Sequence, residues 1–171
     1  QDLCVNNNSA VIINHMASVY GMNDVTHLGF FDIPMLTSIP NLVYLAPTNN
    51  EELLAMTEYA VHQHEHPVAI RVPVGEFTST GVADTTDYSI LNKSEVTRRG
   101  ERIALLGLGN FYHLANQVAD ALAKDGINAT VVNPKFASGL DEVLLEELKA
   151  NHSVVFTFED GVVEGGWGQR V

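Results

Sequence analysis

Segment 21–32 gathers the side chains of this chain that are most suited to chemistry. It packs glycines, two acidic residues and the pair Thr26-His27 into twelve positions. Histidine is the side chain whose ordinary pKa lies closest to neutral pH, so it can bind or exchange protons there. This density of polar groups predicts a binding or catalytic site.

The elements around this segment place it on a loop. Residues 9–13 form an apolar run that predicts a buried strand, and no helical or strand periodicity follows until about Leu36. The polar segment therefore follows the carboxyl end of a strand. In open α/β sheets, ligands bind at that edge.

Strands and helices alternate in two blocks along the chain. Thr48 and Glu51 form a capping box that predicts a helix starting at Thr48. The pattern predicts strands at 42–46, 68–72, 103–106, 129–132 and 154–158, and helices at 48–63, 112–124 and 141–151. Such alternation indicates an α/β fold of two open, mostly parallel sheets.

The region between the two blocks has no clear periodicity and is rich in Thr, Ser, Asp and Gly. We predict an interdomain linker at 76–101 with a short strand near Ile90, a first domain at 1–75 and a second at 102–171. Each block has only about three clear strands, against about five in a typical sheet. We therefore expect the chain to be part of a longer protein.

Composition limits the classes of partner. Twenty-one acidic and nine basic residues give a formal charge of −12, which argues against binding nucleic acid or an anionic membrane. One cysteine, Cys4, cannot form an internal disulfide, and no apolar run approaches the roughly 18 residues of a membrane span. These features predict a cytoplasmic protein in which Cys4 is a small buried apolar residue.

Several motifs in register resemble one enzyme family. A loop of the form Gly-x-Asp-Gly-x-Thr-His-x-Gly-x-Phe-Asp, then Ile-Pro-Asn and Ala-Pro, is typical of the transketolase family, and most closely of its 1-deoxy-D-xylulose-5-phosphate synthases. The matching residues here are Gly21, Thr26, His27, Gly29, Phe31, Asp32, Ile39-Pro40-Asn41 and Ala46-Pro47. Further matches continue through Arg71 and Glu159 to Gly165-Gly166.

The resemblance implies part of a pyrimidine-binding domain followed by most of a carboxyl-terminal domain. It implies thiamine diphosphate and Mg²⁺ as cofactors, held by residues expected upstream of this chain, and a homodimer. The implied reaction joins a 2-keto acid, pyruvate, to an aldehyde, glyceraldehyde 3-phosphate, and releases carbon dioxide for isoprenoid precursor and thiamine synthesis. His27 matches the catalytic histidine over the substrate, with Asn23 and Thr26 as further substrate-binding residues.

Four positions that depart from the family pattern bear on the substrate. Asn23 stands where the family has aspartate and Asp24 where it has glycine, so position 23 carries no charge. Met16 and Val74 occupy the positions of two arginines that contact the acceptor's phosphate in the synthases. Losing two charge-assisted bonds, each worth about 1.5–3 kcal/mol, would weaken a phosphorylated acceptor by about 100-fold or more.

Two alternatives to the synthase therefore stay open. One is a transketolase-like paralogue that moves a two-carbon unit to a different aldehyde, and the other is a non-catalytic regulatory or assembly subunit.

Other candidate sites are weaker. His62, His64 and His66 alternate like strand residues but lie at a helix end, which favours a solvated terminus over a metal site. Gly107-Leu108-Gly109 lacks the remainder of a dinucleotide fingerprint. Glu159-Asp160 is interpreted as a turn and domain contact, and Trp167 as an interface residue.

Overall fold

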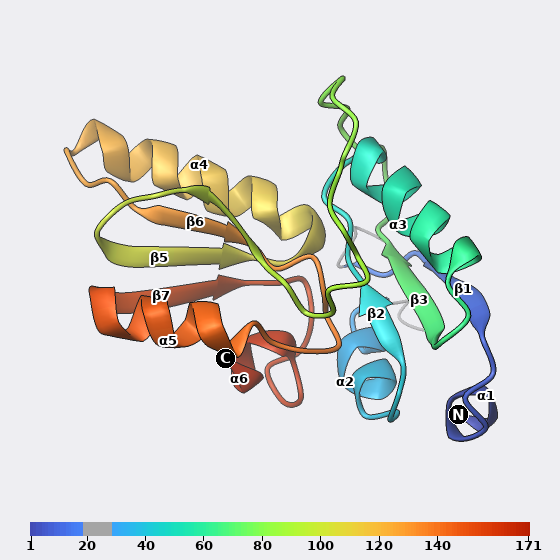
Figure 1. Cartoon of the computed structure of the whole chain (residues 1–171). Helices are drawn as coiled ribbons and strands as arrows, with labels where there is room; N and C mark the ends of the chain where they lie inside the picture. The colour runs from blue at the N-terminus through green and yellow to red at the C-terminus, as the bar shows by residue number, and fades with distance from the viewer. Residues whose placement is uncertain (19–28) are drawn as a thin grey trace.

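The structure is a computed structural model and describes residues 1–18 and 29–171. Two sheets lie side by side along the chain, each with helices packed against it (Figure 1). The described strands are mostly parallel, so the predicted fold class is confirmed. No helix in these two ranges is long and apolar enough to cross a membrane.

The first sheet has the strand order β1-β3-β2, and all its pairs are parallel. Its elements are α1 (Asp2–Val5), β1 (Ala10–His15), α2 (Asp32–Thr37), β2 (Val43–Leu45), α3 (Asn50–His62) and β3 (Pro67–Val72). The central strand β3 reads Pro-Val-Ala-Ile-Arg-Val and is buried at every position before Val72. A continuous apolar run of this kind is typical of a parallel strand covered on both faces.

The second sheet has the order β4-β6-β5-β7. Its elements are β4 (Glu95–Arg98), β5 (Arg102–Gly107), η1 (Gly109–Phe111), α4 (Tyr112–Lys124), β6 (Thr130–Asn133), α5 (Glu142–Asn151), β7 (His152–Phe158) and α6 (Trp167–Arg170). Helices α4 and α5 lie on opposite faces of this sheet (Figure 1). The helix predicted at 112–124 is confirmed at both ends.

The strand predicted near Ile90 is wrong. The side chain of Asp87 accepts hydrogen bonds from the backbone N–H and the hydroxyl of Ser89, and the N–H of Ile90 donates to the carbonyl of Asp87. These local bonds make a turn and leave the side chain of Ile90 exposed. The strand that does lie inside the predicted linker is β4, which pairs antiparallel with β6 of the second sheet.

The predicted cap of α3 is displaced by one residue. Asn49, not Thr48, is the N-cap, because its side chain accepts from the backbone N–H of Glu52 at 2.8 Å. The carboxylate of Glu52 reaches back to the backbone N–H and the hydroxyl of Thr48. This arrangement leaves Glu51 free to bind the linker, where it accepts from Ser79 and from two backbone N–H groups at 80–81.

The Glu51 contact predicts a loss of stability in acid. The hydrogen bond from Ser79, aided by the Thr80 N–H, lowers the pKa of Glu51 from 4.5 to about 2. A depressed carboxyl pKa stabilises the fold fully above the ordinary pKa, and that contribution disappears as the pH falls through the folded value. Stability should therefore decline between about pH 4.5 and pH 2. Thermal melts of Glu51→Gln should show lower stability at neutral pH but a shallower acid decline, and curves parallel to those of the parent would contradict this.

Backbone hydrogen bonds join the two sheets. The N–H of Ala46, after β2, donates to the carbonyl of Lys135 at 2.8 Å, and the N–H of Ala137 donates to the carbonyl of Tyr44 at 2.7 Å. One buried apolar cluster also takes residues from both sheets, including Ala69 of β3 and Leu106 of β5. Trp167 of α6 is buried and belongs to the same cluster.

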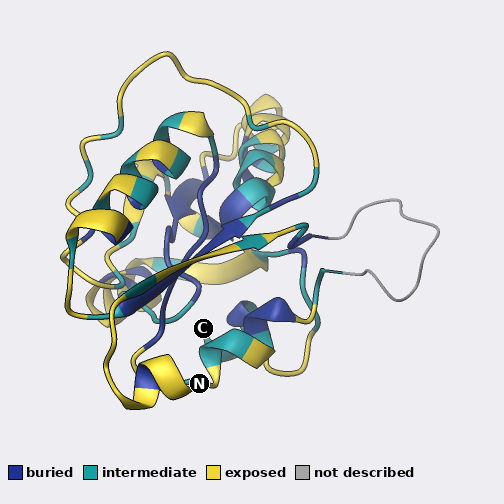
Figure 2. Cartoon of the chain, turned by 90° about the vertical axis from the view of Figure 1, so that its right-hand side faces the viewer, coloured by how far each residue is buried: buried dark blue, intermediate teal, exposed yellow. Residues whose placement is uncertain are grey.

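Apolar side chains are exposed on two edge strands. Val11, Ile12 and Ile13 of β1 are exposed, as are Val154 and Phe156 of β7. Both strands lie at the end of their sheet in the described chain. Buried positions concentrate instead in the central strands β3, β5 and β6 (Figure 2).

Candidate functional site

The predicted site residues Asn23, Thr26 and His27 lie outside the described residues, so the structure does not test their roles. The residues that flank them on either side are described. Residues 16–18 follow β1, and residues 29–32 lead into α2. These two flanks form the stems of the loop.

The stem that enters the loop is bonded to the carboxyl end of β3. The N–H of Ala17 donates to the carbonyl of Val72 at 3.1 Å, and the N–H of Val74 donates to the hydroxyl of Ser18 at 3.2 Å. Ala17 and Ser18 are both buried. The loop thus begins from a fixed position at the sheet edge where the sequence predicts a site.

The two stems touch each other at Gly29 and Met16. A Cβ added to Gly29 would lie 1.7 Å from the carbonyl oxygen of Met16, far inside van der Waals contact. Met16 itself has a left-handed backbone, with φ of +62°. Glycine is therefore required at position 29 for the two stems to approach each other this closely.

Met16 and Val74 are the positions of the two replaced arginines, and the structure brings their backbones together. His15 pairs with Val72 in the β1–β3 register, so Met16 and Val74 follow adjacent strands at the same edge. Ser18, two residues after Met16, bonds Val74 directly. Apolar side chains thus stand at both positions that the resemblance assigns to phosphate contacts.

A buried ion cluster holds the stem that leaves the loop. Arg71, on β3, donates from Nε and Nη2 to the two carboxylate oxygens of Asp32, at 2.7 and 3.2 Å. Its Nη1 donates to Oδ1 of Asp160, and its Nη2 also reaches the backbone oxygen of Asp160 at 3.2 Å. The side chains of all three residues are at most 6% exposed. Asp32 is the first residue of α2, so Arg71 fixes the exact point where the loop ends.

Neighbouring polar groups complete the cluster. The hydroxyl of Tyr44, on β2, donates to Asp32, and the side-chain amide of Asn14, on β1, donates to the Tyr44 oxygen at 2.7 Å. Burial, and next the charge of Asp32, raise the pKa of Tyr44 well above its ordinary value, so the phenol stays protonated. Burial alone would lower the pKa of Arg71, but hydrogen bonding to Asp32 and the charges of both carboxylates raise it. Arg71 is therefore a permanent cation whose guanidinium is committed to this cluster.

A second buried cluster lies between the sheets around Lys135. Its ammonium donates to Glu52 of α3 at 2.9 Å and to Thr86 of the linker at 3.0 Å, and it pairs with Glu95 of β4 at 3.0 Å. Asn133 donates to the same Glu52 carboxylate at 2.7 Å. Burial would lower the pKa of Lys135, but the charge and hydrogen bond of Glu52 raise it. This cluster joins helix α3, the predicted linker and the second sheet, and the sequence pattern did not predict it.

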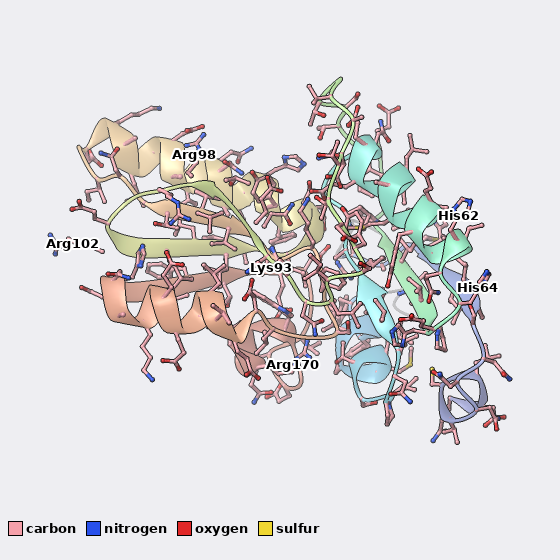
Figure 3. All side chains as sticks on the ribbon, in the orientation of Figure 1. His62, His64, Lys93, Arg98, Arg102 and Arg170 are labelled. Atoms are coloured by element: carbon pink, nitrogen blue, oxygen red, sulfur yellow. The ribbon has the colours of Figure 1, made fainter. Side chains whose placement is uncertain are left out.

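The weaker candidates resolve as structural residues. His62 ends α3 and bonds the Glu58 carbonyl, and His62 and His64 point outward from that end of the molecule (Figure 3). Gly107 allows α4 to approach β5, because a Cβ there would lie 2.5 Å from the Cα of Tyr112. Cys4 is buried and unpaired.

The pair Glu159-Asp160 also has a structural role. The carboxylate of Glu159 accepts from the backbone N–H groups of Trp167 and Gly168, at the start of α6. Asp160 forms the contact with Arg71 described above. The pair thus makes a helix contact and a contact between the two halves of the chain, as the sequence interpretation expected.

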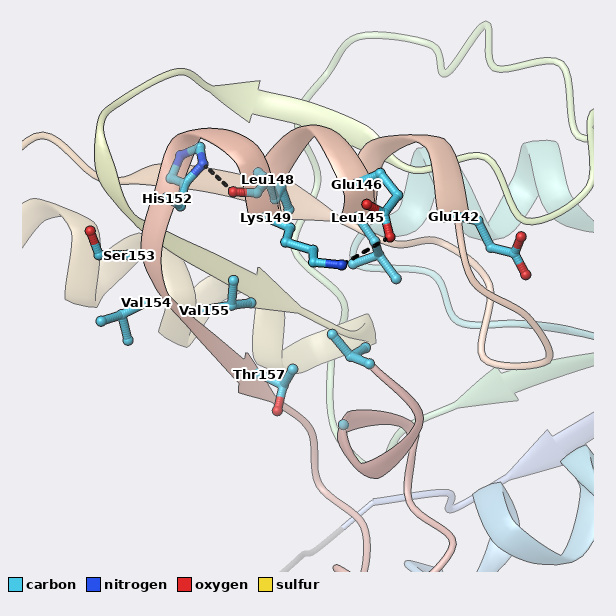
Figure 4. A pocket seen from close by; sticks show the side chains of 12 residues that line it. Glu142, Leu145, Glu146, Leu148, Lys149, His152, Ser153, Val154, Val155 and Thr157 are labelled. Atoms are coloured by element: carbon cyan, nitrogen blue, oxygen red, sulfur yellow. Dashed lines mark hydrogen bonds and ion pairs between the residues drawn. The ribbon is translucent and has the colours of Figure 1, made fainter.

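A hollow of about 730 Å³ lies between α5 and β7 (Figure 4). Its lining includes Leu145, Val154 and Val155, and contains no residue of the loop stems or of the Arg71 cluster. It is therefore separate from the candidate site. Among the residues that the structure describes, no group of three or more His, Cys, Asp or Glu side chains could hold a metal ion.

Comparisons with known proteins agree with this arrangement. The family model described as "Transketolase, pyrimidine binding domain" matches residues 5–79, and "Transketolase, C-terminal domain" matches residues 92–171. A solved structure titled "Split gene transketolase, inactive beta4 tetramer" superposes on 97% of this chain and 53% of its own, with a TM-score of 0.80 and 24% identity. That likeness shows the fold.

Curated relatives extend the match over nearly the whole chain. The 1-deoxy-D-xylulose-5-phosphate synthase of Natranaerobius thermophilus is 35% identical over 170 residues, and that of Desulforudis audaxviator is 37% identical over 172. Each alignment covers 99% of this chain and 27% of the relative, so the chain spans just over a quarter of their length. With a pyrimidine-binding model followed by a C-terminal model, and with relatives of this identity, the chain belongs to the transketolase family of thiamine-diphosphate enzymes.

Proposed function

We propose that the enzyme containing this chain condenses a 2-keto acid with an aldehyde and releases carbon dioxide, the reaction that its resemblance to the 1-deoxy-D-xylulose-5-phosphate synthases implies. In this proposal residues 1–75 and 102–171 are two domains joined by the linker 76–101, and the enzyme is a cytoplasmic homodimer that uses thiamine diphosphate with Mg²⁺. One observation carries it: both stems of the Thr-His loop are held at the carboxyl edge of the first sheet, where substrates bind in such sheets.

The described residues do not themselves form a seat for the diphosphate and its metal ion. Asp32 and Asp160, two buried carboxylates beside the loop stems, are both committed to ion pairs with Arg71. Thiamine diphosphate supplies the electron sink of such reactions when it is bound. In the proposal, this chain contributes the substrate side of the site: His27 exchanges a proton with a substrate oxygen, and Asn23 and Thr26 hydrogen-bond the substrate.

The replaced arginines define the acceptor in this proposal. Met16 and Val74 offer no charge to a phosphate, and Arg71 cannot substitute because its guanidinium is committed to Asp32 and Asp160. We therefore assign an unphosphorylated aldehyde as the preferred acceptor.

Carbon dioxide release tests this assignment. With pyruvate as donor, glyceraldehyde should stimulate release at least as well as glyceraldehyde 3-phosphate does. Restoring arginine at both sites, Met16→Arg with Val74→Arg, should shift the preference toward the phosphorylated aldehyde by about 100-fold. A strong preference for the phosphorylated aldehyde in the parent enzyme would show that another group binds phosphate, and His15 would be the first to examine. Cofactor binding without any release would favour the non-catalytic subunit.

A further inference from the structure

The second domain contributes a residue to the support of the substrate loop. Asp160 follows β7, in the second sheet, and contacts Arg71 of the first sheet through both its side chain and its backbone oxygen. These residues are 89 positions apart in the sequence, and both are 2% exposed. Arg71 in turn makes a two-pronged contact with Asp32. A continuous chain of charged hydrogen bonds thus runs from the second domain to the end of the loop.

This contact differs from the other polar contacts between the sheets. The Lys135 cluster also joins the two halves, but its partners are Glu52, Thr86 and Glu95, none of which lies in the loop stems. Only the Arg71 cluster, among the described residues, combines a stem residue with a residue of the second sheet through buried charges. The donors of the Arg71 guanidinium form a rigid planar fork. Because Asp32 binds this fork on one side and Asp160 on the other, the guanidinium is held in one orientation.

We propose that Asp160 is a positioning residue: acting through Arg71, it fixes Asp32 and thereby the end of the loop that carries His27. The second domain is then part of the active-site scaffold. This inference deepens the proposed function and rests on it for its kinetic consequence. Its structural consequence, the fixing of residues 29–32, can be measured independently of any activity.

The charge of Asp160 can be removed by the substitution Asp160→Asn. In the described part of the chain its Oδ2 atom is buried without a hydrogen-bond partner, whereas Oδ1 accepts from Arg71. Asp160→Asn keeps an oxygen acceptor for Arg71 and removes the charge, and it places an amide NH2 where Oδ2 is buried. Asn133→Ala is the control, because Asn133 is equally buried and also makes a polar contact from the second sheet to the other half of the chain, with Glu52 of α3.

The kinetic test compares these two variants in the enzyme that contains this chain, well below the melting temperature. Asp160→Asn should lower kcat for carbon dioxide release by about tenfold, with KM for pyruvate changed by less than about threefold, since a misplaced reacting group costs rate more than binding. Asn133→Ala should leave both constants within about twofold. Asp32→Asn should resemble Asp160→Asn, and the double variant should be hardly worse than either single one, because both act through Arg71.

Amide hydrogen exchange provides the second readout. Peptides covering residues 29–37 should exchange faster in Asp160→Asn and at the parent rate in Asn133→Ala. If the parent enzyme proves inactive, the proposed function fails, yet exchange still decides whether Asp160 fixes the stem. Unchanged exchange, unchanged kcat in Asp160→Asn, or independent effects that multiply in the double variant would each overturn the inference.

Discussion

Replacing Arg71 with methionine is expected to lower the free energy of unfolding by about 3–5 kcal/mol. The substitution keeps most of the side-chain volume but leaves Asp32 and Asp160 buried without a counter-ion. A buried carboxylate without a partner costs far more than an exposed ion pair contributes, because it has lost its hydration as well. Urea unfolding followed by circular dichroism measures the change.

The matched control for this prediction is Arg99→Met. Arg99 also pairs with one carboxylate, Glu147 at 3.2 Å, but its side chain is 75% exposed. Removing it should cost about 0–1 kcal/mol. A loss below about 1 kcal/mol for Arg71→Met would mean that the two aspartates become protonated or hydrated at little cost, and the cluster would not anchor the loop.

His27→Ala is expected to lower turnover by about 100-fold or more, the range for losing a general acid–base group. The expectation comes from the register of the Thr-His pair between Gly21 and Gly29, because His27 lies outside the described residues. Turnover should be measured as carbon dioxide release in the enzyme that contains this chain. The control is His64→Ala, two residues beyond the end of α3, which should leave turnover unchanged (Figure 3). Unchanged turnover with a lower melting temperature in His27→Ala would assign it a structural role.

Much of the fold could be predicted from local pattern. Helix α4 matches its prediction because its sequence repeats apolar residues at helical spacing and Gly126 follows its C-cap, Asp125. Local pattern was insufficient where two positions could cap α3: the run Thr48-Asn49-Asn50-Glu51-Glu52 allows either Thr48 or Asn49 as the N-cap, and the structure uses Asn49. Strand β4 escaped prediction because it is short and mostly exposed.

The ion clusters could not be predicted in full, because they join residues distant in sequence. A signal was nevertheless present for Arg71: a charged residue in the centre of an apolar strand must find a buried partner. The sequence does not say which of the 21 acidic residues provides it. Asp32 and Asp160 are selected only when the two sheets pack, which is a property of tertiary structure.

The backbone bonds of Ala46 and Ala137 across the two sheets limit how this protein can be recombined. The residues after β6 continue the hydrogen-bonded edge of β2, and Leu45 and Phe136 form a bridge there. A chimera that takes its second half from a distant homologue would import a foreign strand-like segment into the first sheet. In a recombined enzyme, residues 134–137 should therefore come from the same parent as β2. A crossover between residues 76 and 101 would take the two segments from different parents.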